Sequence, residues 1–407
     1  MNQAESMSFP VTIRLPEGEP ETSPAFYRVA GVMVLTRLIL GAAAAGAKKI
    51  TVTGSYAEIA RSRCSGDQRL KELKVIWGGD PGQEERGISV EANVVVGSPV
   101  WQALAGSDES VFVPGAPAMH RTGTDDPRAL WYGPPPIGAY VIPVRSMDDV
   151  PDAKKAIFAN VTKSTSGPIS RNINALLSIP ISRVLCELGV TPNQMTLVTT
   201  IVGLISAWFV ASGTLVDVAI GGALFQICAA LDRVDGELAR STFRAPPVGA
   251  WLDTLGDNLV YFVFVVCLIT GYHQYTQTHQ LATAGWILPL GISMVIVMLV
   301  LVGGMTWYLL DNDQPGTMTA VHQDLGQKMD AAGTNWLFKV LDRIKILGKR
   351  DSFSFAVFLL AVTPVITDHA LGYHLLFWAS MAVILFISIH FAMAILISRR
   401  QDSTLVS

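Results

Sequence analysis

The chain has 407 residues, of which 50% are hydrophobic and 15% are charged, and its formal net charge is −3 at pH 7. This composition is too apolar for an ordinary soluble protein. The charge shows no basic excess of the kind that follows a nucleic-acid backbone, so nucleic-acid binding is excluded. The four cysteines are scattered without a CxxC pair, so neither a zinc site nor a disulfide framework is predicted.

Residues 1–150 predict a soluble α/β domain. Short β-like runs alternate with helical patterns, an order typical of an open sheet. A helix is expected over residues 28–45, leading into a parallel strand at 50–54. The other β-like runs are residues 11–15, 73–77, 92–97 and 140–144. The start of the chain lacks the basic and apolar regions of a secretory signal, so this domain is expected in the cytoplasm.

Residues 151–194 are interpreted as a linker that contains an amphipathic helix over 169–188. Arg171 and Arg183 lie away from its apolar side, which favours a helix at the membrane interface. A solvated amphipathic connector is the alternative interpretation. The apolar side, read at helical spacing, consists of Ile173, Leu176, Leu177, Ile181, Leu185 and Leu188.

Residues 195–400 are predicted to form a membrane domain. Six segments approach the roughly 20 apolar residues that cross a bilayer: 195–213, 215–231, 248–270, 285–310, 353–371 and 375–397. Lys and Arg crowd the links 232–247 and 311–351 and the C-terminal tail, and the other three connections contain none. Because basic residues stay on the cytoplasmic side, both termini are expected in the cytoplasm. The predicted fold is an α-helical polytopic membrane protein with six transmembrane helices and an N-terminal soluble α/β domain.

Four aspartates surround the link between the second and third predicted spans. Asp232 and Asp235 share one helical face at spacing i, i+3, and Asp253 and Asp257 share another at i, i+4. Carboxylates beside lipid are costly unless they are paired or ligated. Hard oxygen ligands without His or Cys favour Mg²⁺, Mn²⁺ or Ca²⁺. The alternative, that these aspartates cap helices or pair with nearby arginines, explains one Asp at each helix end and not four at fixed spacing.

The whole pattern resembles the signature of the CDP-alcohol phosphotransferase (CDP-alcohol phosphatidyltransferase) family at every specified position. Eight residues carry the resemblance: Asp232, Asp235, Gly236, Ala239, Arg240, Gly249, Asp253 and Asp257. The stretch 191–196 before the first span adds to it. The N-terminal domain resembles a nucleotidyltransferase-like domain, yet it lacks the Gly-rich, Arg-containing loop of an active cytidylyltransferase. A degenerate, non-catalytic domain is therefore expected there.

The resemblance implies an enzyme that transfers a substituted phosphate from a CDP-linked donor to an alcohol and releases CMP, in phospholipid biosynthesis. It assigns the four aspartates to metal, which we expect to be two Mg²⁺ or Mn²⁺ ions, and Asp257 to the general base as well. A guanidinium suits phosphate oxygens. The residues expected to bind the CDP moiety are Asn193, Gly236, Ala239, Arg240 and Gly249.

The identity of the substrates is less constrained by the sequence. Lys349 and Arg350 precede the fifth predicted span and are a candidate acceptor site, although basic anchoring beside a membrane explains them equally well. CDP-diacylglycerol is the favoured donor, and a soluble CDP-alcohol such as CDP-inositol is the alternative. An ion or nucleotide transporter is a remote alternative, because its site is expected near the bilayer midplane.

A homodimer in the membrane is also expected. Gly303 and Gly304 permit close helix contact in the fourth predicted span, and the resembled family is commonly dimeric. The active site is expected to face the cytoplasm, since the aspartates border the basic link 232–247.

Overall fold

The computed structural model describes residues 9–79, 87–106, 119–122, 139–162, 166–244, 247–311 and 350–405. The chain forms two compact units. The first consists of Met1–Thr162 with the short segments Arg183–Gly189 and Leu238–Arg244. The second consists of Lys163–Ser182, Val190–Glu237 and Ala245–Ser407. The first unit therefore extends beyond residue 150 and includes the end of a membrane-domain helix.

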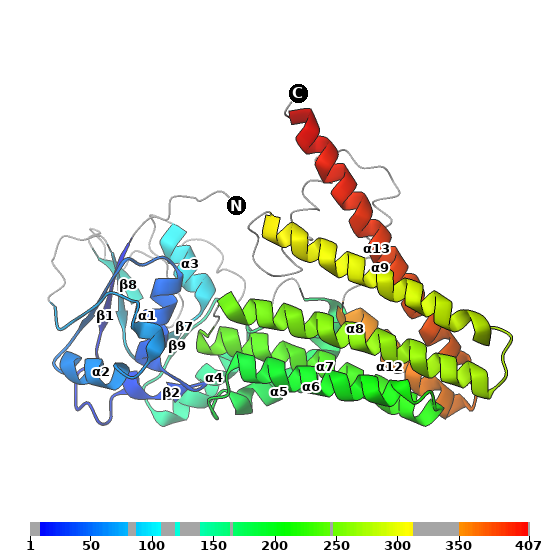
Figure 1. Ribbon diagram of the computed structural model, residues 1–407. Helices are drawn as coiled ribbons and strands as arrows, with labels where there is room; N and C mark the ends of the chain where they lie inside the picture. Colours follow the sequence, from blue (N-terminus) through cyan, green and yellow to red (C-terminus); the bar gives the residue numbers. More distant parts are fainter. Residues whose placement is uncertain are drawn as a thin grey trace. The chain divides into compact units, whose positions relative to one another are not determined.

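A five-stranded sheet in the order β5-β4-β1-β6-β8 is the framework of the first unit (Figure 1). Its central strand β1 (Pro10–Arg14) is parallel to β4 (Lys49–Thr53) and to β6 (Gly87–Glu91). Strand β5 (Val75–Trp77) is parallel to β4, and β8 (Met119–Thr122) is antiparallel to β6. Helix α1 (Val34–Ala44) connects β1 to β4, as a parallel pair requires. The predicted open α/β sheet is confirmed.

Two details of this unit differ from the sequence prediction. Helix α1 begins at Val34 and not at residue 28, because β2 (Arg28–Val29) and β3 (Val32–Met33) form an antiparallel hairpin. Its turn residues Ala30 and Gly31 both have positive φ, as a tight two-residue hairpin requires. The expected strands near 92–97 and 140–144 are β7 (Val94–Val96) and β9 (Val141–Pro143), which pair with each other outside the main sheet.

The remaining short elements of the first unit complete its core. They are η1 (Pro24–Phe26), α2 (Ala57–Cys64), η2 (Gln68–Leu70), α3 (Ser98–Gly106), η3 (Met147–Asp149) and α4 (Val150–Ala159). The buried side chains Ile13, Leu35, Leu38 and Trp101 pack between sheet and helices.

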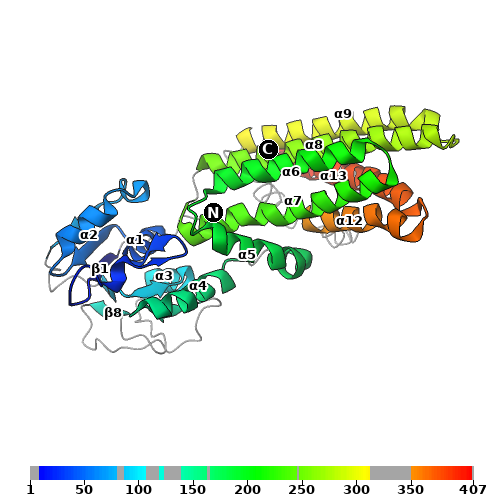
Figure 2. The ribbon, with the colours of Figure 1, turned by 90° about the horizontal axis from the view of Figure 1, so that it is seen from below.

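The second unit is helical throughout its described part. Its helices are α6 (Pro192–Ala211), α7 (Leu215–Thr242), α8 (Pro247–Thr278), α9 (Ala284–Asp311), α12 (Arg350–Thr367) and α13 (Leu371–Leu405), of which α7 ends in the first unit. They follow the π-helical turn η4 (Ser170–Asn174) and α5 (Ala175–Leu185). Helices α6 and α8 run side by side in both views (Figures 1 and 2). Phe225 of α7 stacks on Phe264 of α8 at a centroid distance of 4.2 Å in the buried core.

Five of the described helices are long and apolar enough to cross a membrane: α6, α7, α8, α9 and α13. The apolar helix Asp351–Thr367 is shorter, so the fifth predicted span remains a prediction. Helix α12 ends at Thr367 and not at residue 371, because Asp368 takes a left-handed conformation with φ of 56°. The membrane class predicted from the sequence is confirmed at the level of these five helices.

Helix α7 continues eleven residues beyond its predicted end at 231, to Thr242. Residues 232–242 were expected in a link, but the helix-forming run of Glu237, Leu238, Ala239 and Arg240 extends it to Thr242. The next residue, Phe243, has φ of 55° and terminates the helix. Beyond it, Arg244 N donates to the Ala239 carbonyl at 3.0 Å. This bond across a left-handed residue is a Schellman-type helix end.

Candidate metal centre

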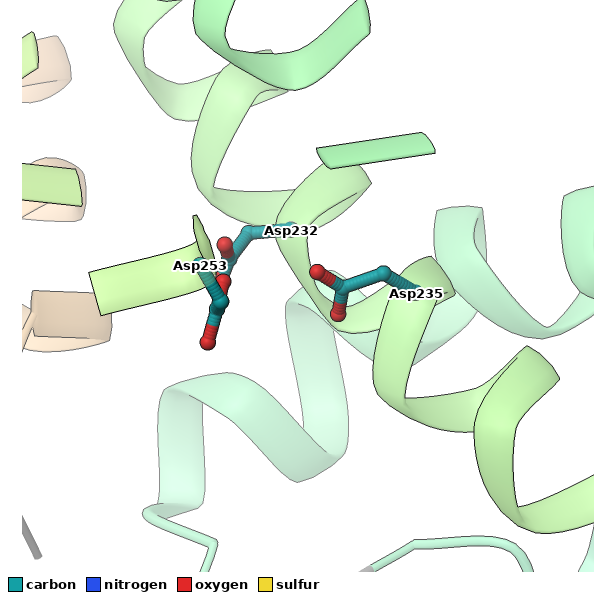
Figure 3. A group of neighbouring side chains, drawn as sticks. All are labelled: Asp232, Asp235 and Asp253. Carbon is teal, nitrogen blue, oxygen red and sulfur yellow. The ribbon is translucent and has the colours of Figure 1, made fainter. Parts of the chain in front are cut away.

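Three carboxylates from two consecutive helices meet at one point of the second unit. Asp232 and Asp235 lie one turn apart on α7, and Asp253 lies near the start of α8. One carboxylate oxygen from each residue lies within 4.8 Å of the other two (Figure 3). All three side chains are half-buried. The spacing predicted from the sequence therefore brings these three residues together.

The donor set of this cluster fits a hard divalent cation. Three carboxylates this close repel one another, and partial burial weakens the solvation that would screen the repulsion. Oxygen ligands that lie within 4.8 Å of one another can converge on one ion, as Mg²⁺ and Mn²⁺ sites require. All three carboxylates belong to helices, two at i, i+3 on α7 and one on α8, so no loop residue is needed to bring them together.

Thr196 is a further site residue that the sequence did not single out. Its Oγ1 donates to Asp235 Oδ2 at 2.9 Å, and its side chain is buried. The start of α6 is fixed by a capping box, in which Thr191 and Gln194 satisfy each other's backbone amides. The only sequence signal for Thr196 was its place in the stretch 191–196. Its hydroxyl orients the Asp235 carboxylate, as outer partners do for carboxylates that bind metal.

Asp257 lies on α8 one helical turn after Asp253, and its side chain is half-buried. Among the described residues, the three-carboxylate group does not include Asp257. The role of all four aspartates in metal binding stays a prediction, and three of them lie close enough together to share one ion. Asp257 lies at i+4 from Asp253, so the two residues share one face of α8.

The expected nucleotide-binding residues lie on three helices. Gly236 is in the last third of α7, Gly249 is in the first turn of α8, and Asn193 is exposed in the first turn of α6. Ala239 and Arg240 lie on the last turns of α7, where Arg240 Nε donates to the Val161 carbonyl at 2.7 Å. One nitrogen of the predicted phosphate-binding guanidinium is therefore engaged by a backbone carbonyl.

The candidate acceptor residues lie at the edge of the described chain. Lys349 lies outside the described residues, and Arg350 is the first residue of α12, with its side chain outside the description. The following residue, Asp351, accepts a hydrogen bond from Asn174 Nδ2 at 2.9 Å. The arginine nearest the metal ligands in sequence, Arg233, pairs with Glu237 at 3.0 Å.

The geometry agrees with comparisons to known proteins. Residues 189–315, which contain all four aspartates, match the family model described as CDP-alcohol phosphatidyltransferase. The chain is 40% identical over 132 residues to a "Bifunctional IPC transferase and DIPP synthase" of Aquifex aeolicus, covering 32% of this chain and 30% of that protein. It is 36% identical over 126 residues to the protein of the same name from Thermococcus kodakarensis, covering 31% and 28% of the two chains.

A third relative, which matches over fewer residues, has a different name from the first two. The chain is 33% identical over 79 residues to the "Archaetidylinositol phosphate synthase" of Pyrococcus horikoshii, covering 19% of this chain and 40% of that protein. The chain thus spans less than a third of the two bifunctional relatives and less than half of the Pyrococcus protein. The matched region nevertheless contains all four aspartates, three of which have carboxylate oxygens within 4.8 Å of one another. The predicted resemblance to the CDP-alcohol phosphatidyltransferase family is therefore confirmed over residues 189–315.

Proposed function

We propose that this protein transfers a substituted phosphate group from a CDP-linked donor to a hydroxyl of a polar alcohol and releases CMP, in a divalent-metal-dependent reaction. The observation that carries the proposal is the convergence of Asp232, Asp235 and Asp253 within 4.8 Å, with Asp257 one turn further along α8. The three clustered carboxylates are proposed to hold the metal that binds the pyrophosphate, and Asp257 is proposed to transfer the proton.

Asp257 acts as the general base in this mechanism. Its carboxylate takes the proton of the acceptor hydroxyl as that oxygen attacks the β-phosphorus of the donor. The bond between the β-phosphorus and the bridging oxygen breaks, and that oxygen leaves as part of CMP. The new phosphodiester keeps the donor's alcohol and gains the acceptor's oxygen. Proton removal by a positioned carboxylate contributes about 10²–10⁴-fold to such reactions.

Two Mg²⁺ or Mn²⁺ ions are the proposed cofactors. Such ions neutralise the pyrophosphate and stabilise both the attacking and the leaving oxygen. Asp232, Asp235 and Asp253 would hold them, with Asp257 at the edge of the set. Thr196 keeps Asp235 oriented through its 2.9 Å hydrogen bond.

The CDP moiety is proposed to lie along α7 and the start of α8. Gly236 and Gly249 have no side chain, and Ala239 has a small one, so nucleotide can approach the backbone closely. Arg240 and Asn193 supply donors for phosphate and base. Lys349 and Arg350 are proposed to hold a polar or phosphorylated acceptor by charge.

CDP-diacylglycerol is the favoured donor, since a membrane domain gives a lipid-linked substrate access to the site. A soluble CDP-alcohol such as CDP-inositol is the second candidate. The Pyrococcus relative is named an archaetidylinositol phosphate synthase, and this likeness favours an inositol-type polyol in the proposed reaction of this chain. The two donors differ in whether the lipid enters with the CDP or with the acceptor.

The N-terminal unit is proposed to be a degenerate nucleotidyltransferase-like domain without catalysis of its own. The segment between β1 and η1 contains Glu17, Glu19 and Glu21 and no Lys or Arg, so it repels the phosphates that an active loop would hold. Helix α1 of this unit contacts the residue that follows α7: the Arg37 guanidinium lies 5.9 Å from the Phe243 ring centroid.

The membrane arrangement is proposed to comprise six spans, with both termini and the active site in the cytoplasm, following the positive-inside rule. The exposed side chains Leu176, Leu177 and Leu188 suit contact with lipid at the membrane interface. A homodimer is proposed through α9, where a Cβ added to Gly303 meets nothing within 4 Å, leaving room for a second helix.

The test measures CMP release by the purified full-length chain in detergent with Mg²⁺. CDP-diacylglycerol and CDP-inositol are each combined with a panel of polar alcohols and phosphorylated polyols, and Asp232→Asn serves as the inactive control. CMP release that needs metal, donor and acceptor together is the expected result. Metal-dependent uptake of ions or nucleotide into vesicles without CMP release from any pair would favour the transporter interpretation and overturn the proposal.

A further inference from the structure

Helix α7 carries a buried ion pair on the side away from the metal carboxylates. Arg233 Nη2 lies 3.0 Å from Glu237 Oε1, and the Glu237 side chain is 0% exposed. With about 3.6 residues per turn, these two residues point away from the face that carries Asp232 and Asp235. A buried carboxylate is costly unless its oxygens are hydrogen-bonded. The partners of Glu237 therefore identify what holds α7 in place.

Those partners are two serines of α5. Ser178 Oγ donates to Glu237 Oε1 at 2.8 Å, and Ser182 Oγ donates to Oε2 at 2.7 Å. Both serines are fully buried and lie at i, i+4 on one helical face. Arg233 Nε in turn donates to Ser178 Oγ at 3.2 Å. Each oxygen of Glu237 thus has its own serine, so only one rotation of α7 about its axis satisfies both.

A second set of contacts involves the π-helical turn η4. Asn174, which is fully buried, accepts from Gln226 Nε2 of α7 at 2.7 Å through its Oδ1. Its Nδ2 donates to Asp351 Oδ1 of α12 at 2.9 Å. Arg233 also donates to Ser170 at the start of the same turn. One short segment therefore binds α7 at two levels and the first turn of α12.

We propose that η4 and α5 form a positioning element that sets α7 and α12 relative to each other, with Glu237 and Asn174 as its positioning residues. This proposal rests on the proposed function, because α7 carries the metal-binding aspartates and α12 begins at the candidate acceptor residue Arg350. Glu237 acts through α7 on the geometry of the metal carboxylates. Asn174 acts through Asp351 on the position of the acceptor residues.

The chemistry of the network favours positioning over bulk stabilisation. An apolar core of similar volume stabilises a helix pair as well as buried charges do or better. A fully satisfied polar network instead selects one arrangement, because each donor and acceptor has a required direction. The buried residues of α5 are Ser178, Ser182 and the small Ala175, whereas Leu176 and Leu177 are exposed. The buried side of α5 is thus its hydrogen-bonding side.

The role of Glu237 is tested by Mn²⁺ binding, which needs no turnover. Electron paramagnetic resonance of the purified full-length chain without substrate gives the dissociation constant for Mn²⁺. We expect Glu237→Ala to weaken binding by about tenfold, because it leaves Arg233 and the two buried serines without their partner and releases the rotation of α7. Glu237→Gln should weaken it less, because the amide retains an oxygen for Arg233, and it carries the test if the alanine variant does not fold. Glu58→Gln changes an exposed glutamate of α2 and should bind like the native chain.

Unchanged Mn²⁺ affinity in both Glu237 variants, when Asp232→Asn loses the ion, would overturn the role of Glu237. A native chain that binds Mn²⁺ but releases no CMP would contradict the proposed function and leave this measurement valid. The two failures are therefore distinguishable.

The role of Asn174 is tested by exchanging its partner. Asn174→Asp removes the amide donor and places a second carboxylate beside Asp351, so we expect the acceptor KM to rise about tenfold with little change in the donor KM. The double variant with Asp351→Asn restores a donor–acceptor pair in the opposite direction and should recover most of the loss. The kinetics use the donor and alcohol that give the fastest CMP release from the native chain. Equal changes in both KM values without recovery in the double variant would overturn the role of Asn174.

Discussion

Thr196→Val removes one hydroxyl from the metal centre and leaves the shape of the side chain nearly unchanged. Thr196 Oγ1 donates to Asp235 Oδ2 at 2.9 Å, and the residue is 7% exposed. A hydrogen bond to a charged group contributes about 1.5–3 kcal/mol, and about 1.4 kcal/mol corresponds to a tenfold change in an equilibrium constant. Outer partners of metal ligands change metal affinity by about 10–100-fold when they are removed. We therefore expect the Mn²⁺ dissociation constant to rise by about tenfold to a hundredfold.

Thr199→Val is the matched control for this variant. Thr199 lies on the same helix and is 4% exposed, and among the described residues its Oγ1 has no hydrogen-bond partner. The control should bind Mn²⁺ like the native chain and unfold at the same or a higher temperature. Equal Mn²⁺ affinities for Thr196→Val, Thr199→Val and the native chain would refute the claim that Thr196 orients a metal ligand.

Two further predictions concern the acceptor and the first unit. Arg350→Ala should raise the acceptor KM more than the donor KM, because a charge-assisted contact to an anion is lost, and Arg350→Lys should restore only part of it; unchanged kinetics for every acceptor would leave Arg350 as a membrane anchor. Gly31→Ala should lower the unfolding temperature by several degrees, because Gly31 has φ of 72° and its added Cβ would lie 2.1 Å from the Cys186 carbonyl oxygen. Gly46→Ala, at φ of 97° in open space, should have the smaller effect in the same thermal scan, and equal shifts would contradict the steric argument.

The cluster of three carboxylates could be predicted from the sequence because its residues lie on consecutive helices. Asp232 and Asp235 lie on one face of a single helix, and Asp253 opens the next helix along the chain. Helical periodicity and a short connection therefore determine most of the geometry. The parallel unit from β1 through α1 to β4 was predictable for the same reason, since a helix followed by an apolar strand has few other solutions.

The polar network behind α7 could not be predicted in this way. In the sequence, Glu237 has no feature that separates it from other charged residues after a membrane span. Its partners Ser178 and Ser182 precede it by 59 and 55 positions. The apolar spacing over residues 169–188 predicted an apolar side but gave no signal for the side that contacts α7. The end of α7 was misplaced because the apolar run ends at residue 231, whereas residues that favour a helix continue to Arg240. The hairpin at residues 28–33 was missed because a two-residue turn at Ala30 and Gly31 interrupts an otherwise helical apolar pattern.

The central claim is that three aspartates hold the metal while the fourth removes the acceptor proton. The most direct test is the rate of CMP release by Asp257→Asn, measured beside Asp232→Asn with saturating Mg²⁺, donor and alcohol. The amide keeps the size of the side chain but loses its basicity. We expect the rate of Asp257→Asn to fall by at least about 10²-fold, with Mn²⁺ and donor binding retained better than in Asp232→Asn. A normal rate in Asp257→Asn at neutral pH, with metal and donor bound, would contradict the assignment of the base.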